Sequence, residues 1–220
     1  KTVKKVLSDH GFADPKIKKP CVTAPYATEP LHIDFPVYRY LEWTDQYELA
    51  VGKEHSDENN RSWSYSEPKK FVDWMKSREP SKYHSATENI SSVEKSQFYR
   101  LVRYIKRWRD FKYSSETARS KIYSISLSIM VRECFIPIVD ENSKPDDNES
   151  LRLTLDQILT DYRYFSYTGS AYNVEVRLPV YPNSDTFKSN GIQVGSVLRN
   201  RLTKLRDCLS EVSEMDSEVD

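Results

Sequence analysis

The chain has 220 residues, which is long enough to bury a sizeable core in one or two domains. Its 33 Lys and Arg balance its 33 Asp and Glu, so no overall field attracts a polyanion, and any such site must come from local clustering. Aromatic residues at 12% exclude a mainly disordered chain, and only 5 glycines argue against a Gly-rich phosphate loop.

The three cysteines, Cys21, Cys134 and Cys208, are widely spaced, with no C-x-x-C pair and no nearby histidine to complete a zinc site. We interpret them as reduced thiols. No apolar run approaches the roughly 20 residues of a membrane span, and the N-terminus lacks the apolar stretch of a signal peptide. We therefore expect a cytoplasmic protein that does not associate with a membrane.

The first part of the chain predicts a small lobe that contains strands. Its expected elements are, in chain order, a helix ending near residue 9, a hairpin of strands at 19–26 and 31–41, a polar loop at 52–61 and a helix beginning at Pro68. Ser66 is the expected cap of that last helix. Residues 77–92 are rich in Ser, Pro and Glu, a composition typical of a linker.

The second part of the chain predicts a mostly helical lobe. A stripe with helical spacing begins after Val93, at Phe98, Leu101, Val102, Ile105 and Trp108. The further expected elements are a helix at 121–135, an acidic loop at 139–150, a helix at 151–159, an irregular stretch at 178–190 and a closing helix at 198–212. We thus divide the chain into a first lobe (1–80), a helical lobe (90–213) and an acidic tail (214–220) that should fray.

Residues 31–38 predict a strand that carries a carboxylate. The apolar residues of this strand alternate, at Leu31, Ile33, Phe35 and Val37. Because successive side chains point to opposite faces, we expect these four to lie on the core and Asp34 to point away from it. Phosphoryl-transfer sites hold metal ions with carboxylates, which makes Asp34 the first candidate for chemistry. An ordinary exposed strand aspartate gives the same pattern.

Residues 100–109 combine an apolar stripe with basic side chains. Lys106 lies one turn after Val102, at the edge of the stripe, where its compact ammonium suits a flexible triphosphate. A solvated basic face explains the same pattern, and it is the interpretation that we favour for Arg100, Arg107 and Arg109.

Three serines, Ser124, Ser126 and Ser128, interrupt the apolar helix expected at 121–135. Small hydroxyls in a helix usually bond back to carbonyl groups, although one of them could instead donate to a phosphate oxygen. Four aromatic residues are candidates for stacking on a base, with core or rim packing as the alternative: Trp63, Tyr65, Trp74 and Tyr172. The four histidines show no arrangement of a nucleophile or a metal site, which disfavours a histidine-based hydrolase.

The order of these segments resembles the cGAS/DncV-like nucleotidyltransferases (CD-NTases), bacterial relatives of animal cGAS and of oligoadenylate synthases. Each motif alone is weak, but their order is fairly specific. The resemblance rests on residues 31–38, on Trp63 with residues 66–74, on residues 101–109, on residues 121–127, and on Leu178-Pro179 followed by residues 185–187.

The resemblance implies an α+β fold, with part of a polymerase-β-like nucleotidyltransferase palm of antiparallel strands followed by a helical lobe. Asp34 resembles the third metal-binding carboxylate of the family, while Lys106 and Ser124 resemble the residues that hold the donor triphosphate. The implied cofactors are two Mg²⁺ ions, and the implied substrates are nucleoside triphosphates. Family members make cyclic or linear oligonucleotide second messengers, usually in antiphage signalling (CBASS). The resemblance leaves room for a regulatory protein partner, and we expect no stable nucleic-acid partner.

The chain departs from the family pattern in one respect. The Gly-Ser turn and the Asp-x-Asp strand that should precede Asp34 have no counterpart, because Gly169-Ser170 and Gly195-Ser196 come too late and lack the following acidic pair. An N-terminal segment outside this sequence, a second chain, or a remnant that binds without catalysing would each explain this. We favour the first explanation and expect these 220 residues alone to be inactive.

Two alternative functions remain open from the sequence. The first is a catalytically incomplete module of the same fold that binds a nucleotide or a partner. The second is an RNA- or tRNA-directed nucleotide-adding enzyme, which the zero net charge disfavours, because a tRNA substrate usually requires a broad basic surface.

Overall fold

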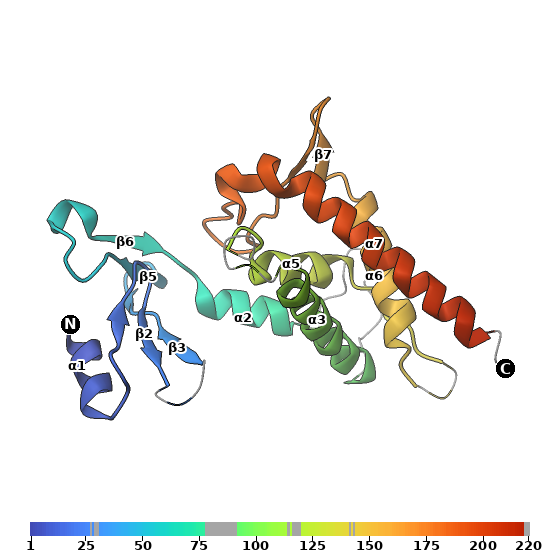
Figure 1. Cartoon of the computed structure of the whole chain (residues 1–220). Helices are drawn as coiled ribbons and strands as arrows, with labels where there is room; N and C mark the ends of the chain where they lie inside the picture. Colours follow the sequence, from blue (N-terminus) through green and yellow to red (C-terminus); the bar gives the residue numbers. More distant parts are fainter. Residues whose placement is uncertain are drawn as a thin grey trace. The chain divides into compact units, whose positions relative to one another are not determined.

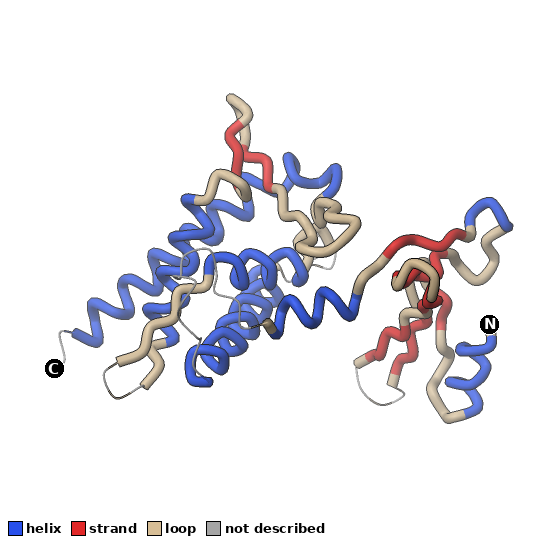
Figure 2. Tube along the Cα trace, turned by 180° about the vertical axis from the view of Figure 1, so that it is seen from behind, coloured by secondary structure: helices blue, strands red, loops and turns tan. Residues whose placement is uncertain are grey.

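A computed structural model of the chain describes residues 1–26, 28, 31–77, 92–113, 115, 120–140, 142 and 144–217. The chain divides into two compact units (Figure 1). Unit 1 comprises Lys1–Asp73 with Val180–Pro182, and unit 2 comprises Trp74–Pro179 with Asn183–Asp220. The fold class is α+β, as the sequence predicts. Antiparallel sheets dominate unit 1 and helices dominate unit 2 (Figure 2).

Unit 1 contains two small antiparallel sheets. The first has the order β1-β2-β3 and the second the order β4-β5-β6. The elements are α1 (Thr2–Asp9), β1 (Lys16–Ile17), β2 (Val22–Pro25), β3 (His32–Phe35), β4 (Tyr38–Leu41), β5 (Gln46–Val51), a 3₁₀ turn (Glu58–Asn60), β6 (Ser62–Tyr65) and α2 (Pro68–Lys76), within which the division from unit 2 falls. The predicted hairpin is confirmed as the β2–β3 pair, but its second strand, expected at 31–41, is divided into β3 and β4, which belong to different sheets. The helix beginning at Pro68 is confirmed as α2.

The cap of α2 differs from the prediction by one residue. The first helical hydrogen bond runs from Phe71 N–H to the Glu67 carbonyl oxygen, at 2.9 Å, so Glu67 precedes the first turn. Ser66 instead donates its backbone N–H to the Tyr47 carbonyl oxygen at 3.0 Å and continues the sheet. The pairing of β6 with β5 therefore extends to the residue that was expected to start the helix.

The core of unit 1 is small and lies between α1 and β2. Leu7, Val22 and Ala24 are buried together, and Phe35 packs partly against them. The expected apolar face of the 31–38 strand is not covered in this way: Leu31 is 57% exposed, and Ile33 and Val37 are each 37% exposed. That prediction was wrong, because β3 pairs only with β2 and α1 packs on β2 rather than on β3.

Unit 2 is built around four helices and one hairpin among its described residues. Its elements are α3 (Ser92–Lys112), α5 (Ser124–Cys134), α6 (Asp147–Thr160), β7 (Phe165–Tyr167), β8 (Tyr172–Val174), a 3₁₀ turn (Lys188–Asn190) and α7 (Gly191–Ser217). The expected helices are confirmed. The predicted linker lies outside the described residues, except for Ser77 and Ser92 at its ends.

The acidic stretch at 139–150 is only partly a loop. The Asp146 carboxylate accepts a hydrogen bond from Glu149 N–H at 2.9 Å and caps α6, which therefore begins at Asp147 rather than at Leu151. The hairpin of β7 and β8 was not predicted. None of the described helices is long and apolar enough to cross a membrane.

Helix α5 forms the centre of unit 2. Eight of its eleven residues are buried, and the predicted stripe of α3 packs beside it with Leu101 and Ile105 almost fully buried. Leu198 and Leu202 of α7 complete this core. Because α5 is buried on most sides, its sequence is apolar around most of its circumference.

The N-terminal turns of α7 lie against β8 at a distance that only glycine allows. A Cβ atom at Gly195 would overlap the Tyr172 carbonyl oxygen, and one at Gly191 would overlap that of Val174. The Ser196 hydroxyl accepts a hydrogen bond from Tyr172 N–H at 2.9 Å and fixes the same contact. This close approach anchors the β7–β8 hairpin to the helix.

We predict that Gly195→Ala lowers the free energy of unfolding by about 1–3 kcal/mol, because the added methyl group must push α7 away from β8. Chemical denaturation with the change in midpoint as readout measures this effect. Asn200→Ala, at an exposed site on the same helix, is the control and should change the free energy by less than about 0.5 kcal/mol. Equal midpoints for wild type and Gly195→Ala would contradict the close packing.

Candidate functional site

Asp34 lies in the middle of β3 and faces Thr23 of β2 in the antiparallel register. The Thr23 hydroxyl donates a hydrogen bond to Asp34 Oδ1 at 2.5 Å. Thr23 is buried, whereas the side chain of Asp34 is 50% exposed. The carboxylate is therefore held on one side by the Thr23 hydroxyl, and half of the side chain remains exposed.

The surroundings of Asp34 favour its ionised form. The Thr23 hydroxyl bond lowers the pKa of Asp34 most, and burial opposes it. His32 Nε2 lies 3.9 Å from Asp34 Oδ2 and lowers that pKa further when it is protonated. Burial raises the pKa of Cys21, whose sulfur lies 3.7 Å from the Thr23 hydroxyl. The positive charge of Lys18 lowers the pKa of Asp34 as well, so several contacts together favour its ionised form.

A metal centre needs more than this carboxylate. Within the described part of the chain, no group of three or more His, Cys, Asp or Glu side chains is placed to hold a metal ion. The neighbours of Asp34 are a threonine, a cysteine and a histidine, not a second carboxylate. These residues alone do not fit a centre of two Mg²⁺ ions, which takes several carboxylate ligands.

Lys106 lies on α3, half-buried at the edge of the apolar stripe. Burial lowers the pKa of its ammonium, and the nearby positive charge of Arg109 lowers it further. Among the described residues, Lys106 has no carboxylate within ion-pair distance. A partly desolvated cation without a counter-charge is suited to bind an anion.

The neighbouring arginines are not the solvated basic face that we expected. Arg100 forms two hydrogen bonds with Asp147 of α6, at 2.6 and 2.8 Å, and both side chains are at least three-quarters buried. Arg109 binds Asp110 at 2.6 Å and the Ile122 carbonyl oxygen at 3.3 Å. Only Arg107 of the three is exposed as predicted. Arg100 pairs with a residue 47 positions away, and Arg109 folds back onto its neighbour Asp110 and onto the Ile122 carbonyl, so neither contact follows from the spacing of the helix.

Ser124 is the first residue of α5, next to the loop that Arg109 holds through Ile122. No side-chain hydrogen bond caps the start of α5. The other two serines are occupied: Ser128 donates to the Ser124 carbonyl oxygen at 2.8 Å, and Ser126 lies 2.7 Å from the Thr186 hydroxyl. Of the three candidates, Ser124 is thus the one whose hydroxyl has no bond to another described residue.

The motif at 185–187 packs against the same end of α5. Phe187 is fully buried, with its ring centroid 6.2 Å from that of Tyr123. Asp185 accepts hydrogen bonds from the N–H groups of Val176 and Phe187 and shapes the turn. The role of this segment is therefore to fix the start of α5, on which Ser124 lies.

The four candidate stacking residues already have partners. Arg39 lies over the Trp63 ring at 4.4 Å, and Tyr65 contacts Tyr181 edge to face. The other two also carry an arginine on the ring, Arg132 over Trp74 and Arg199 over Tyr172. These contacts support the packing interpretation, and only Trp63 and Tyr65 remain substantially exposed.

Solved structures provide the comparison. No family model and no curated protein matches the chain. A mutant of the Vibrio cholerae di-nucleotide cyclase (DncV) in complex with ATP, GTP and 5MTHFGLU2 matches at a TM-score of 0.61 with 17% identity, over 95% of this chain and 51% of that chain. DncV in complex with GTP and 5MTHFGLU2 matches at 0.59 with 18% identity, over 94% and 49%.

A third structure, the Vibrio cholerae cyclic AMP-GMP synthase DncV with a linear intermediate, matches at a TM-score of 0.55 with 18% identity, over 94% of this chain and 49% of that chain. At this level of identity the likeness shows the fold. The fold is that of part of this nucleotidyltransferase, as the sequence predicts. The chain spans about half the length of the solved structures that it matches.

We predict that Thr23→Val raises the pKa of Asp34, because it removes the hydrogen bond that most favours the carboxylate. Because the folded pKa of Asp34 is lowered, its ionisation stabilises unit 1 above the unfolded pKa and ceases to do so as the pH falls through the folded value. The variant should lose that pH dependence. NMR titration of the Asp34 carboxyl carbon measures the shift.

Thr44→Val is the matched control for this titration, because the Thr44 hydroxyl contacts only the Leu41 carbonyl oxygen. It should leave the pKa of Asp34 unchanged. A Thr23→Val protein in which Asp34 titrates as in wild type would show that the hydroxyl does not hold this carboxylate.

Proposed function

We propose that this chain is part of a nucleotidyltransferase that joins nucleotides from nucleoside triphosphates, with Asp34 as one of its metal-binding carboxylates. The observation that carries this proposal is the match of 95% of the chain to a cyclase whose structure contains ATP and GTP. The order of the sequence motifs points to the same class independently of that match.

Asp34 supports this role through its charge and its geometry. Its carboxylate is ionised, fixed on one side by Thr23 and half-exposed on the other, which are the properties of a ligand that binds a cation from outside the sheet. The proposal requires at least two further carboxylates from beyond the described residues. Bound Mg²⁺ ions would supply charge neutralisation for the triphosphate and activation of the attacking hydroxyl.

Lys106 and Ser124 are proposed to bind the triphosphate from unit 2. The Lys106 ammonium is half-buried without a carboxylate partner, and Ser124 presents its hydroxyl at the start of α5. Backbone N–H groups in the first turn of a helix favour negative charge at the same place. Arg109 would then act indirectly, because it links α3 to the residues that precede Ser124.

The products proposed for this enzyme are cyclic or linear oligonucleotides that serve as second messengers in antiphage signalling in the cytoplasm. The support for a cyclic product is that one matched structure is a cyclic AMP-GMP synthase. A regulatory protein partner of this enzyme is part of the same proposal.

A second candidate function is a binding module of the same fold that holds a nucleotide or a partner without catalysis. The observation that favours it is the composition of the Asp34 surroundings, where hydroxyl, thiol and imidazole groups stand in place of a second carboxylate. Such a module would keep the anion-binding role of Lys106 and would not need the charge of Asp34.

We predict that Asp34→Asn in the full-length protein abolishes oligonucleotide synthesis from labelled triphosphates and Mg²⁺. The rate should fall by more than the roughly 10- to 100-fold loss that follows removal of a residue that only hydrogen-bonds a metal ligand. Lys106→Met should lower kcat/KM by about 10- to 100-fold, which corresponds to one charged hydrogen bond. Thin-layer chromatography of the products provides the measurement.

Asp14→Asn and Lys204→Met are the matched controls, because both side chains are exposed and the two substitutions remove the same charges at other places in the chain. Neither should change the rate by more than about twofold. Full activity of Asp34→Asn would exclude the metal-binding role proposed for Asp34, whereas retained triphosphate binding without synthesis in the wild type would favour the module. Synthesis by these 220 residues alone would contradict our account of the metal site.

A further inference from the structure

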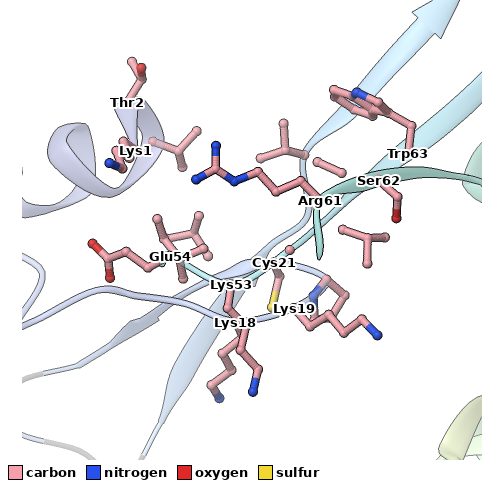
Figure 3. A pocket seen from close by; sticks show the side chains of 18 residues that line it. Lys1, Thr2, Lys18, Lys19, Cys21, Lys53, Glu54, Arg61, Ser62 and Trp63 are labelled. Atoms are coloured by element: carbon pink, nitrogen blue, oxygen red, sulfur yellow. The ribbon is translucent and has the colours of Figure 1, made fainter. Parts of the chain in front are cut away.

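Unit 1 contains a hollow of about 670 Å³ that none of the functional assignments above uses. It lies between the start of α1, the turn from β1 to β2, and the segment that joins β5 to β6 (Figure 3). We call it the basic hollow, because five of its lining residues are cations: Lys1, Lys18, Lys19, Lys53 and Arg61. Neither Asp34 nor Thr23 lines it.

Two contacts hold the walls of the basic hollow together. Gly52 donates its N–H to the Lys19 carbonyl oxygen at 2.8 Å, which joins the end of β5 to the turn before β2. Lys4 of α1 binds both carboxylate oxygens of Glu54, at 3.0 and 3.1 Å, which joins the helix to the same segment. The hollow is therefore defined by hydrogen bonds from three elements.

The charge of the hollow is not balanced by its own carboxylate. Glu54 is its one acidic lining residue. The hydrogen bond from Lys4 lowers the pKa of Glu54, and the charge of the Lys4 ammonium balances that of the ionised carboxylate. Among the described residues, none of the five cations has a carboxylate within ion-pair distance. In a chain whose net charge is zero, this is a local concentration of positive charge without a direct ion pair.

The hollow also offers an apolar floor and a flat ring. Its floor contains aliphatic side chains of β2 and β5, including Val22 and Val51. Trp63, 43% exposed, lies at one side, with one ring face covered by Arg39 at 4.4 Å. Figure 3 shows the Arg61 side chain extending toward α1, while the side chains of Lys18 and Lys53 extend away from Arg61.

We propose that the basic hollow binds a nucleoside polyphosphate, with its phosphates on Arg61 and Lys53 and its base on the apolar floor beside Trp63. A concave site of this volume is typical for a ligand of nucleotide size, whereas an extended nucleic acid is usually bound along a groove. Arginine and lysine together suit phosphate, since arginine binds two oxygens at once and lysine acts as a point charge. The proposal does not depend on catalysis at Asp34.

The test measures binding of ATP, inorganic triphosphate and adenosine to the full-length protein by calorimetry in EDTA, which removes binding through Mg²⁺. We expect ATP to bind more tightly than either fragment. The double variant Lys53→Gln/Arg61→Gln should weaken ATP binding by tenfold or more, about the effect of one charged hydrogen bond. The control double variant Lys69→Gln/Lys204→Gln removes the same charge outside the hollow and should change the affinity by less than about twofold.

Further variants separate this proposal from the proposed enzyme. Trp63→Phe should reduce the change in tryptophan fluorescence on binding. Loss of ATP binding in Lys106→Met, but not in the Lys53 and Arg61 double variant, would overturn the hollow and leave the enzyme proposal intact. Equal weakening by both double variants, or tighter binding of a single-stranded oligonucleotide than of ATP, would also overturn it.

Discussion

The pairing of β3 with β2 is the constraint on which the candidate site depends. β2 is buried along Val22, Thr23 and Ala24, whereas every residue of β3 except Phe35 is exposed. The register puts Asp34 directly opposite Thr23, so a buried hydroxyl and a half-exposed carboxylate satisfy each other. A shift of one residue would leave the Thr23 hydroxyl without this acceptor, and an unsatisfied buried group is costly. The register therefore fixes the position and the ionisation of Asp34 together.

The two units differ in how their charged side chains are paired. Unit 2 pairs its charges across elements, with contacts between Arg100 and Asp147, Arg163 and Glu133, and Arg206 and Asp156. Unit 1 gathers Lys18, Lys53 and Arg61 around a hollow whose single carboxylate is bound to Lys4. A net charge of zero thus excludes a global field without excluding a local anion site. Internal pairing in unit 2 makes the unpaired cations, Lys106 among them, the informative ones.

Sequence periodicity was sufficient to predict the long helices, but it did not predict which elements and side chains contact one another. The stripe of α3 recurs at helical spacing from Phe98 to Ile105, so its buried face was predicted correctly, except that Trp108 is only partly buried. The alternation of β3 separates two faces, but it does not say which face another element covers, and Ile33 is exposed for that reason. The partner of Arg100 lies 47 residues away at Asp147, and the basic hollow combines residues from separate turns, so neither leaves a local pattern. Of the candidate site, the sequence could identify Asp34 but not its donor Thr23.

The kind of group that lowers a carboxylate pKa decides what that carboxylate can still do. Asp147 and Asp34 both have lowered pKa values, the first chiefly through Arg100 and the second chiefly through the Thr23 hydroxyl. Arginine stabilises the ionised form by cancelling its charge, so Asp147 has little attraction left for a cation. A neutral hydroxyl stabilises the ionised form and leaves its full negative charge. Asp34 is therefore ionised and oriented without a direct ion pair to a lysine or an arginine among the described residues, and this combination, rather than its position in the sequence, makes it fit to bind a metal ion.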